Sequence, residues 1–268
     1  MVTRDSAAGT ILIALILCVV CSVVVAGTAV GLRPTQRANR ELDQKKNVLI
    51  AGGLYEAGDA KDEIEEKFET VRRVLIDLDT GEPVPEEVLE AENIDPATYD
   101  PVKAAKNTRL NKKIPAGALP GILTRAKYNF VFEVMEGGEV QQYIFPIYGN
   151  GLWSTMYGYL ALDKDLTTVR GITYYQDGET PGLGGEINNS RWQASWRGKQ
   201  LYGPGGDVQL EVIKGSAPDG ADDKIDGLSG ATITANGVTD TLDYWFGPEG
   251  FEPFIAKQRQ NAAGGTDG

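Results

Sequence analysis

The feature that most constrains this chain is an uncharged segment of 27 residues from Ser6 to Leu32. Residues 10–30 within it are almost wholly apolar, and a helix needs about 20 such residues to cross a bilayer. A cleaved signal peptide is the alternative, with a weak cleavage site near residues 27–29, but its apolar core is usually shorter. We therefore predict a short tail over residues 1–10 and one transmembrane helix over residues 11–32.

The charges around this segment bear on its orientation. Arg4 and the amino terminus are the positive groups before it, whereas a basic set follows it: Arg33, Arg37, Arg40, Lys45 and Lys46. The positive-inside rule places the following domain in the cytoplasm, although the rule is a weak guide for one span before a long domain. The flanking charges alone leave the orientation open.

Composition narrows the chemistry that this domain can perform. The chain has no histidine, and its only cysteines, Cys18 and Cys21, lie inside the apolar segment. A Ser-His-Asp triad, histidine-ligated metals and an iron–sulfur cluster are therefore excluded from the domain, and any electron carrier there must be organic. The net charge of −12 argues against a nucleic-acid partner. We interpret the two cysteines, spaced i,i+3 on one helical face, as small residues at a helix–helix contact, with a redox-active pair as the alternative.

Residues 33–120 are predicted to form a helical and loop-rich region close to the anchor. Pro34 should end the span, and a helix should follow over about residues 37–54. Further on, Phe68, Val71, Val74 and Leu75 have helical spacing on a solvated element. Four prolines between residues 83 and 101 indicate a loop-rich connection after it.

Residues 121–260 are predicted to form an α+β domain. Gly137-Gly138 is a two-residue hairpin signal between two strand-like runs. The predicted strands are residues 128–135, 140–148, 157–162, 167–175 and 208–213. The predicted helices are residues 189–201, 234–246 and 254–260, and residues 261–268 should form a disordered tail.

Three glycine-rich stretches, residues 149–158, 178–186 and 226–234, each follow a strand or its exit loop, where ligand sites gather. Glycines permit close backbone approach, Trp153 can stack on a planar ring, and Thr180 can donate a hydrogen bond. Together they indicate a planar aromatic cofactor with a phosphate, although ordinary turns and a core Trp153 are the alternatives. Glu179 and Glu186 are interpreted as solvated or capping groups.

The third stretch reads Asp226-Gly227-Leu228-Ser229-Gly230-Ala231-Thr232-Ile233-Thr234 and precedes a predicted helix. Helix N-termini favour phosphate because their free N–H groups and the helix dipole both attract negative charge. An N-capping turn explains the same residues equally well. On these grounds the stretch is either a cap or a phosphate site, and its three hydroxyls are equivalent candidates.

The chain resembles the C subunit of the bacterial sodium-translocating NADH:quinone oxidoreductase. The resemblance covers the N-terminal span, RPTQRANRELDQKKNVL after it, GNGLWSTMYGYLALD, GITYYQDGETPGLGGEI and DGLSGATITANGV. The last motif is also a flavinylation signature shared by several covalent-flavin proteins. The resemblance therefore implies a single transmembrane helix followed by a mixed α/β, extracytoplasmic FMN-binding domain.

The same resemblance implies FMN attached by a phosphoester bond to Thr232, with no catalytic residue and no metal site in this chain. A separate flavin transferase takes FMN from FAD with the help of Mg²⁺. It would recognise Asp226, Gly227, Ser229, Gly230 and Ala231. The implied cofactor-binding residues are Trp153, Glu179, Thr180, Leu183, Lys214, Ser229, Gly230 and Ala231.

The implied role is electron transfer in a respiratory complex that oxidises NADH, reduces quinone and pumps Na⁺. The implied partners are the A, B, D, E and F subunits, the flavin transferase and membrane lipid, and the domain should face the periplasm of the bacterial inner membrane. One alternative is the G subunit of an Rnf-type electron-transport complex, which uses the same signature. Another is a membrane-anchored ligand-binding or scaffold protein without a redox role.

Overall fold

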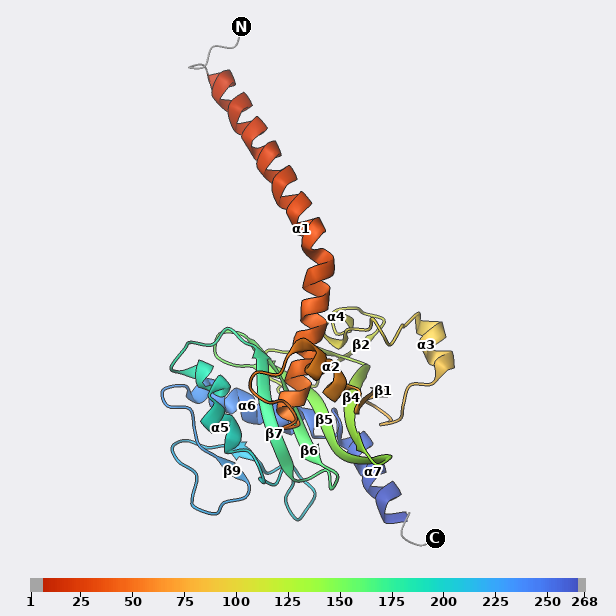
Figure 1. Ribbon diagram of the computed structural model, residues 1–268. Helices are drawn as coiled ribbons and strands as arrows, with labels where there is room; N and C mark the ends of the chain where they lie inside the picture. The colour runs from red at the N-terminus through yellow and green to blue at the C-terminus, as the bar shows by residue number, and fades with distance from the viewer. Residues whose placement is uncertain (1–6, 265–268) are drawn as a thin grey trace. The chain divides into compact units, whose positions relative to one another are not determined.

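The computed structural model describes residues 7–264 of the chain, with side chains up to residue 262. The chain divides into two compact units between Gln44 and Lys45, and each unit is described by itself. Helix α1 (Ala7–Ala51) begins in the first unit, and its last turns belong to the second (Figure 1). Among the described residues it is the one helix long and apolar enough to cross a membrane.

Helix α1 passes through Pro34 without a break, so the separate helix predicted over about residues 37–54 is instead the continuation of α1. Proline removes one N–H group from the helical ladder. The residues that follow, such as Gln36, Arg37, Ala38 and Glu41, are strong helix formers that favour continuation. Of the predicted tail over residues 1–10, Ala7 to Thr10 are helical, and residues 1–6 lie outside the described residues.

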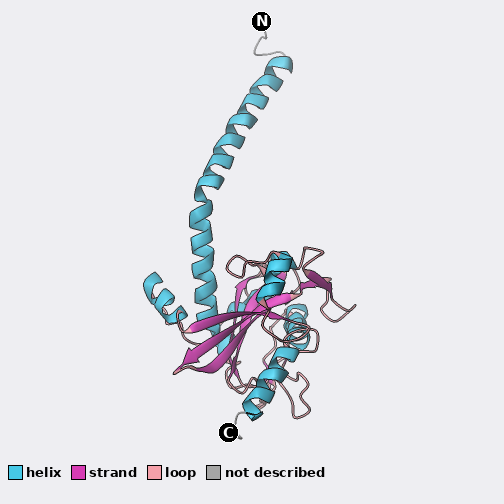
Figure 2. Ribbon diagram, turned by 90° about the vertical axis from the view of Figure 1, so that its right-hand side faces the viewer, coloured by secondary structure: helices cyan, strands magenta, loops and turns pink. Residues whose placement is uncertain are grey.

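The second unit is built on a five-stranded antiparallel sheet in the order β1-β4-β5-β6-β7. Figure 2 shows this sheet from a second side. Four of its strands confirm the sequence prediction: β4 (Tyr128–Glu136), β5 (Glu139–Asn150), β6 (Thr155–Asp163) and β7 (Val169–Gln176). Gly137 and Gly138 join β4 to β5 with φ values of 60° and 88°, as a two-residue hairpin turn requires.

Strand β1 (Val71–Asp77) was missed by the sequence prediction, which placed helical spacing here. Helix α2 (Lys61–Phe68) ends just before it. Pairing of β1 with β4 sets Val71 opposite Val134 and Leu75 opposite Phe130, so pairing with a neighbouring strand overrides the local pattern. The expected boundary at residue 120 is therefore not a structural division, because the earlier region supplies an edge strand to the same sheet.

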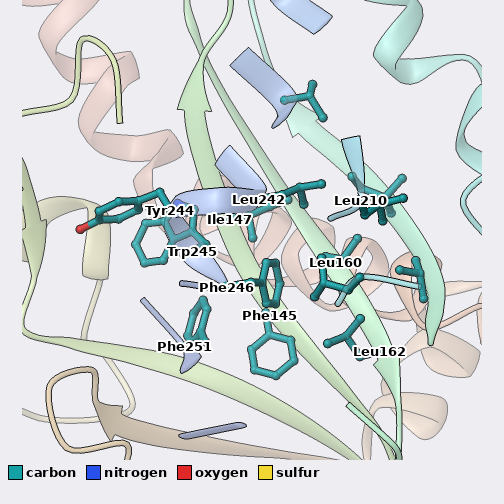
Figure 3. Packing of buried hydrophobic residues seen from close by; sticks show 14 of the residues in the cluster. Phe145, Ile147, Leu160, Leu162, Leu210, Leu242, Tyr244, Trp245, Phe246 and Phe251 are labelled. Atoms are coloured by element: carbon teal, nitrogen blue, oxygen red, sulfur yellow. The ribbon is translucent and has the colours of Figure 1, made fainter. Parts of the chain in front are cut away.

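The two faces of the sheet are covered by different parts of the chain. Ile144 lies on the face against the end of α1, where a Cβ added to Gly52 would be 3.0 Å from its Cδ1. Its neighbour Phe145 points to the other face, because successive side chains of a strand alternate. There it meets Phe246, Phe251 and Phe254, with ring centroids 5.4, 4.9 and 6.2 Å away. Figure 3 shows this packing.

Helix α6 (Thr232–Trp245) packs on this second face and begins two residues before its predicted start. It approaches the end of β5 closely at Gly237, where a Cβ would collide with the carbonyl oxygen of Asn150. At its other end, the buried Trp245 donates from Nε1 to the carbonyl oxygen of Tyr148 at 2.7 Å. These contacts fix the first turn of α6 beside the end of β5.

Helix α7 (Glu252–Gly264) closes the core and continues past the predicted end at residue 260. The expected disordered tail is therefore wrong for residues 261–264, where Asn261, Ala262 and Ala263 precede the first glycine. Alanine has the highest helix propensity, so two alanines favour continuation of the helix. The rest of the predicted tail, residues 265–268, lies outside the described residues.

Short elements complete the unit. They are α3 (Glu86–Glu92), α4 (Pro101–Ala104), β2 (Asn111–Lys113), β3 (Thr124–Ala126), η1 (Gly184–Asn188), α5 (Ser190–Ala194), β8 (Glu211–Val212) and β9 (Lys224–Ile225). The helix predicted over residues 189–201 is much shorter because the chain turns at Gly198 and pairs with the start of β7, where Gly198 N–H donates to Val169. The predicted strand 208–213 is reduced to β8, which pairs in parallel with β9.

We expect Phe145→Ala to lower the free energy of unfolding by about 3–5 kcal/mol, because the side chain is fully buried among three other rings. Urea unfolding of the full chain in detergent, followed by tryptophan fluorescence, measures the change. Leu123→Ala is the control, since Leu123 is largely exposed, and it should change stability by less than about 0.5 kcal/mol. Equal effects of the two substitutions would contradict the assigned core.

Candidate functional site

The three glycine-rich stretches lie at one end of the sheet and meet around the carboxylate of Glu179. This side chain is 7 % exposed, so the expectation that it is solvated is wrong. Its Oε1 accepts hydrogen bonds from the N–H groups of Trp153 and Ser154 at 2.9 and 3.1 Å. Its Oε2 accepts from Leu152 N–H at 3.2 Å and from the hydroxyl of Thr234 at 2.7 Å.

Two glycines make room for this carboxylate. A Cβ on Gly151 would lie 2.6 Å from Oε1 of Glu179, and a Cβ on Gly184 would lie 2.6 Å from its Oε2. Real Cβ atoms do not approach other atoms so closely, so a larger residue at either position would displace the carboxylate. Glycine in the first two stretches is thus required by close packing around one charged group.

The carboxylate of Glu179 is stabilised in its charged form. Burial acts to raise its pKa, but the hydroxyl of Thr234 and the three backbone N–H groups outweigh burial and hold the pKa of Glu179 below its ordinary value. Glu186, by contrast, is half-buried, and its Oε2 accepts a hydrogen bond from Asn189 at 2.7 Å. Of the two glutamates, Glu186 alone remains consistent with the expectation of a solvated or capping group.

The third stretch is held by hydrogen bonds to residues 215–217 and by a contact with the second stretch. Gly227 N–H donates to the carbonyl of Gly215 at 2.7 Å, and Asp226 accepts from Ala217 N–H at 2.7 Å. Gly230 has a φ of 71°, which favours glycine, and a Cβ there would lie 2.8 Å from Cδ2 of Leu183. The side chain of Leu183 therefore joins the second stretch to the third.

The three hydroxyls of the third stretch have different environments. Ser229 and Thr232 are exposed, whereas Thr234 is 1 % exposed and donates to Glu179. Residues two apart on a helix point in directions about 200° apart, so Thr232 faces out where Thr234 faces in. No local pattern in the sequence indicates this difference, and the anchoring role of Thr234 was missed because its partner lies 55 residues away.

A cleft of about 410 Å³ lies beside the start of α6. That size falls within the roughly 300–1,000 Å³ usual for ligand sites. Thr232, Ser229 and Gly230 line it together with Asp226, Gly227 and Lys214. It therefore combines an exposed hydroxyl, a cation and a helix N-terminus whose N-cap residue, Ala231, makes no side-chain capping hydrogen bond.

The remaining candidate residues lie outside this cleft. The described residues that line the cleft do not include Trp153, Glu179, Thr180 or Leu183. Ala231 is buried. Trp153 and Leu183 are 70 % and 43 % exposed. Thr180 is exposed, and its carbonyl accepts from the N–H groups of Leu183 and Gly185.

Comparison with known proteins identifies the domain that contains this site. Residues 151–246 match the model of the FMN-binding domain family. This range contains the second and third glycine-rich stretches and residues 151–158 of the first. The C subunit of the Na(+)-translocating NADH-quinone reductase of Yersinia pestis is 43 % identical over 97 % of this chain and 96 % of its own. The same subunit of Pseudomonas aeruginosa is 42 % identical, over 98 % of this chain and 100 % of its own.

The chain belongs to the family of the Na(+)-translocating NADH-quinone reductase C subunit. The crystal structure of NqrC of Shewanella oneidensis agrees with this fold, with a TM-score of 0.73, 33 % identity and coverage of 83 % of this chain and 99 % of that one. The crystal structure of the same subunit from Parabacteroides distasonis gives a TM-score of 0.63 at 27 % identity and covers 84 % of this chain and 96 % of that one.

Family membership confirms the predicted fold class, with one N-terminal candidate span before an FMN-binding domain of mixed α and β structure. It also confirms the resemblance drawn from the sequence motifs. The identity over nearly the whole chain favours this family over an Rnf-type G subunit and over a scaffold without a redox role.

We expect Glu179→Gln to destabilise the protein at neutral pH, because an amide accepts with only one oxygen and sets its NH₂ group against N–H donors. A carboxyl with a lowered pKa in the folded state stabilises the fold above its ordinary pKa of 4.5, and this contribution is lost as the pH falls through the folded value. The gap between variant and wild type in urea midpoint should therefore be largest near pH 7 and shrink below about pH 4.5. A gap that does not change with pH would exclude this role for the charge.

Proposed function

We propose that this chain carries FMN esterified through its phosphate to Oγ1 of Thr232 and transfers electrons within a membrane-bound Na⁺-translocating NADH:quinone reductase. The observation that carries the proposal is the difference between the two threonines of α6. The hydroxyl of Thr232 is exposed in a cleft at the start of the helix, whereas that of Thr234 is buried and engaged with Glu179. Of these two threonines, only Thr232 is accessible to a flavin transferase.

The residues around Thr232 fit a phosphate. The first N–H groups of a helix have no acceptor within the helix, and its dipole places partial positive charge there. Lys214 lines the same cleft and adds a full positive charge. A phosphodiester at Thr232 would thus be held in an otherwise acidic protein.

The surroundings also suit the flavin ring. Trp153 and Leu183 expose large apolar surfaces beside the glycine-rich stretches, and Leu183 contacts the third stretch at Gly230. Covering such surfaces with a planar ring removes apolar area from water. We assign Trp153, Thr180 and Leu183 to the ring, and Lys214, Ser229, Gly230 and Ala231 to the attachment end. Glu179, whose carboxylate is engaged with the protein, orders the loops between them.

Attachment requires a separate transferase that uses FAD and Mg²⁺. The hydroxyl of Thr232 displaces AMP from FAD, so that one phosphoester bond forms as the pyrophosphate bond breaks. We assign recognition to the small residues Gly227, Ser229, Gly230 and Ala231, together with Asp226. The carboxylate of Asp226 orders residues 215–217 through Ala217, which keeps the cleft in shape.

Bound FMN supplies the electron-transfer chemistry that this chain lacks, since its domain has neither histidine nor cysteine. The protein holds the group, orients its ring and prevents its loss during turnover. We assign the NADH site and the ion path to the partner A, B, D, E and F subunits. Between residues 6 and 32 the chain has no carboxylate that an ion pathway in the membrane would need.

We propose that α1 anchors the chain in the bacterial inner membrane, in contact with lipid and partner subunits, and that the FMN-binding domain lies on the periplasmic side. The basic residues after the span favour the opposite orientation, but a long domain can cross the membrane despite such charges. Residues 11–32 would then span the bilayer, residues 33–120 would follow the span and lend β1 to the sheet, and residues 121–260 would hold FMN.

Thr232→Ala should abolish covalent flavin, because it removes the attacking hydroxyl. After co-expression with a flavin transferase and denaturing electrophoresis, the wild type should give a band that fluoresces under ultraviolet light, and the variant should give none. Thr234→Ala should still give the band after long expression, since its hydroxyl is buried. A dark wild-type band would disprove covalent attachment, and a fluorescent Thr232→Ala band would move the bond to another residue.

Protease added to intact spheroplasts should digest the domain after residue 33 while cytoplasmic marker proteins survive. A C-terminal tag detected by antibody reports the cut, and lysed spheroplasts show that the protease is active on the chain from either side. Full protection in intact spheroplasts with digestion after lysis would reverse the proposed orientation.

A further inference from the structure

The carboxylate of Glu179 has no accepting capacity left for a ligand. A carboxylate offers about four acceptor positions. Here each oxygen already accepts two hydrogen bonds, from Trp153 and Ser154 on Oε1 and from Leu152 and Thr234 on Oε2. Glu179 therefore affects a bound flavin through the groups it holds rather than by a direct bond from its carboxylate.

Those groups come from two separate parts of the fold. Three are consecutive backbone N–H groups in the turn between β5 and β6, which carries the exposed ring of Trp153. The fourth is the hydroxyl of Thr234, two residues after the exposed Thr232. The carboxylate thus links the loop with the ring-stacking side chain to the helix turn with the attachment hydroxyl.

Without the hydrogen bonds to Glu179, the backbone of residues 151–154 would have greater conformational freedom. Glycines flank the carboxylate on both sides at Gly151 and Gly184, and glycine loses more conformational entropy on ordering than any other residue. Hydrogen bonds to a charged group are stronger than those between neutral groups, so a single buried carboxylate can hold both segments. The loop also has a backbone hydrogen bond from Gly151 N–H to the carbonyl of Ser154 at 2.8 Å, and Oγ of Ser154 accepts from Gly178 N–H at 2.6 Å. Neither bond reaches helix α6, so the contact that joins this loop to Thr234 is the carboxylate of Glu179.

We infer that Glu179 and Thr234 form a positioning pair that fixes the loop of Trp153 relative to Thr232 before flavin is attached. The effect of this pair on flavin attachment rests on the proposed attachment at Thr232. The hydrogen bond between Glu179 and Thr234 itself is present in the protein without flavin. Holding reacting and binding groups in place in advance lowers the entropy lost when the ligand is bound and joined. The buried Thr234 thus helps to position the exposed Thr232.

The test is Thr234→Val, which keeps the shape of the side chain and removes its hydroxyl. Amide hydrogen exchange is measured on the full flavin-free chain in detergent. Exchange of the N–H groups of Leu152, Trp153 and Ser154 should become roughly tenfold faster, since a hydrogen bond to a charged group is lost. The initial rate of flavin attachment with transferase, FAD and Mg²⁺ should fall by a similar factor. Thr234→Ser, which restores the hydroxyl, should recover both.

Thr239→Val is the matched control. Thr239 lies on the same helix, and its hydroxyl oxygen accepts from Val212 N–H at 3.0 Å, so this variant also loses one hydrogen bond between α6 and a neighbouring element. It should speed exchange at Val212 while exchange at residues 152–154 changes less than about twofold. Because Val212 lines the cleft, this control is compared by exchange and not by the attachment rate. A general loss of stability would instead affect both loops in both variants.

Unchanged exchange at residues 152–154 in Thr234→Val would overturn the positioning pair. Faster exchange with an unchanged attachment rate would overturn its role in attachment. If the wild type accepts no flavin, the proposed function fails, yet the exchange data still decide whether the pair exists. Should Thr234→Val not fold, Thr234→Ala gives the same measurement with a smaller side chain.

Discussion

The approach of helix α6 to the end of strand β5 is the contact on which the site depends. Gly237 allows the helix to reach the backbone of Asn150, and Trp245 secures its other end through the carbonyl of Tyr148. Because α6 is fixed at Gly237 and at its last residue, its first turn has a defined position beside the loop that leaves β5. The carboxylate of Glu179 can then bridge the short distance from that loop to Thr234. A looser helix would leave the same residues without a common site.

Electrostatics bears on how an acidic chain would hold the phosphate of the proposed FMN. The net charge of −12 is unfavourable for phosphate at long range. At the cleft, however, the uncapped start of α6 and Lys214 supply local positive potential, while the buried charge of Glu179 is neutralised by four donors and directed away from solvent. In the proposed site the phosphate would therefore be held by these local groups, against both the net charge of the chain and the carboxylate of Asp226 in the same cleft.

The sequence predicted the elements whose signals are local. The hairpin at Gly137-Gly138 and strands β4 to β7 follow from alternation and turn chemistry, and α6 follows from its apolar face and its stop at Gly247-Pro248. Strand β1 was missed because its stability comes from β4, some 60 residues away. Helix α5 was predicted too long because the chain beyond it pairs with the start of β7, which no local pattern reveals.

By itself, the sequence determined that the chain has an apolar segment long enough to span a bilayer, a domain without histidine-ligated metals or thiol chemistry, and a motif that identifies its family. Through its resemblance to this family, the motif also pointed to Thr232 among its three hydroxyls. Only the tertiary structure shows that Thr232 is exposed and Thr234 is buried, because burial depends on which side of α6 faces the sheet and on a carboxylate 55 residues away. Composition and local pattern are properties of short stretches of chain, whereas the exposure of Thr232 and the anchoring of Thr234 arise from contacts between distant ones.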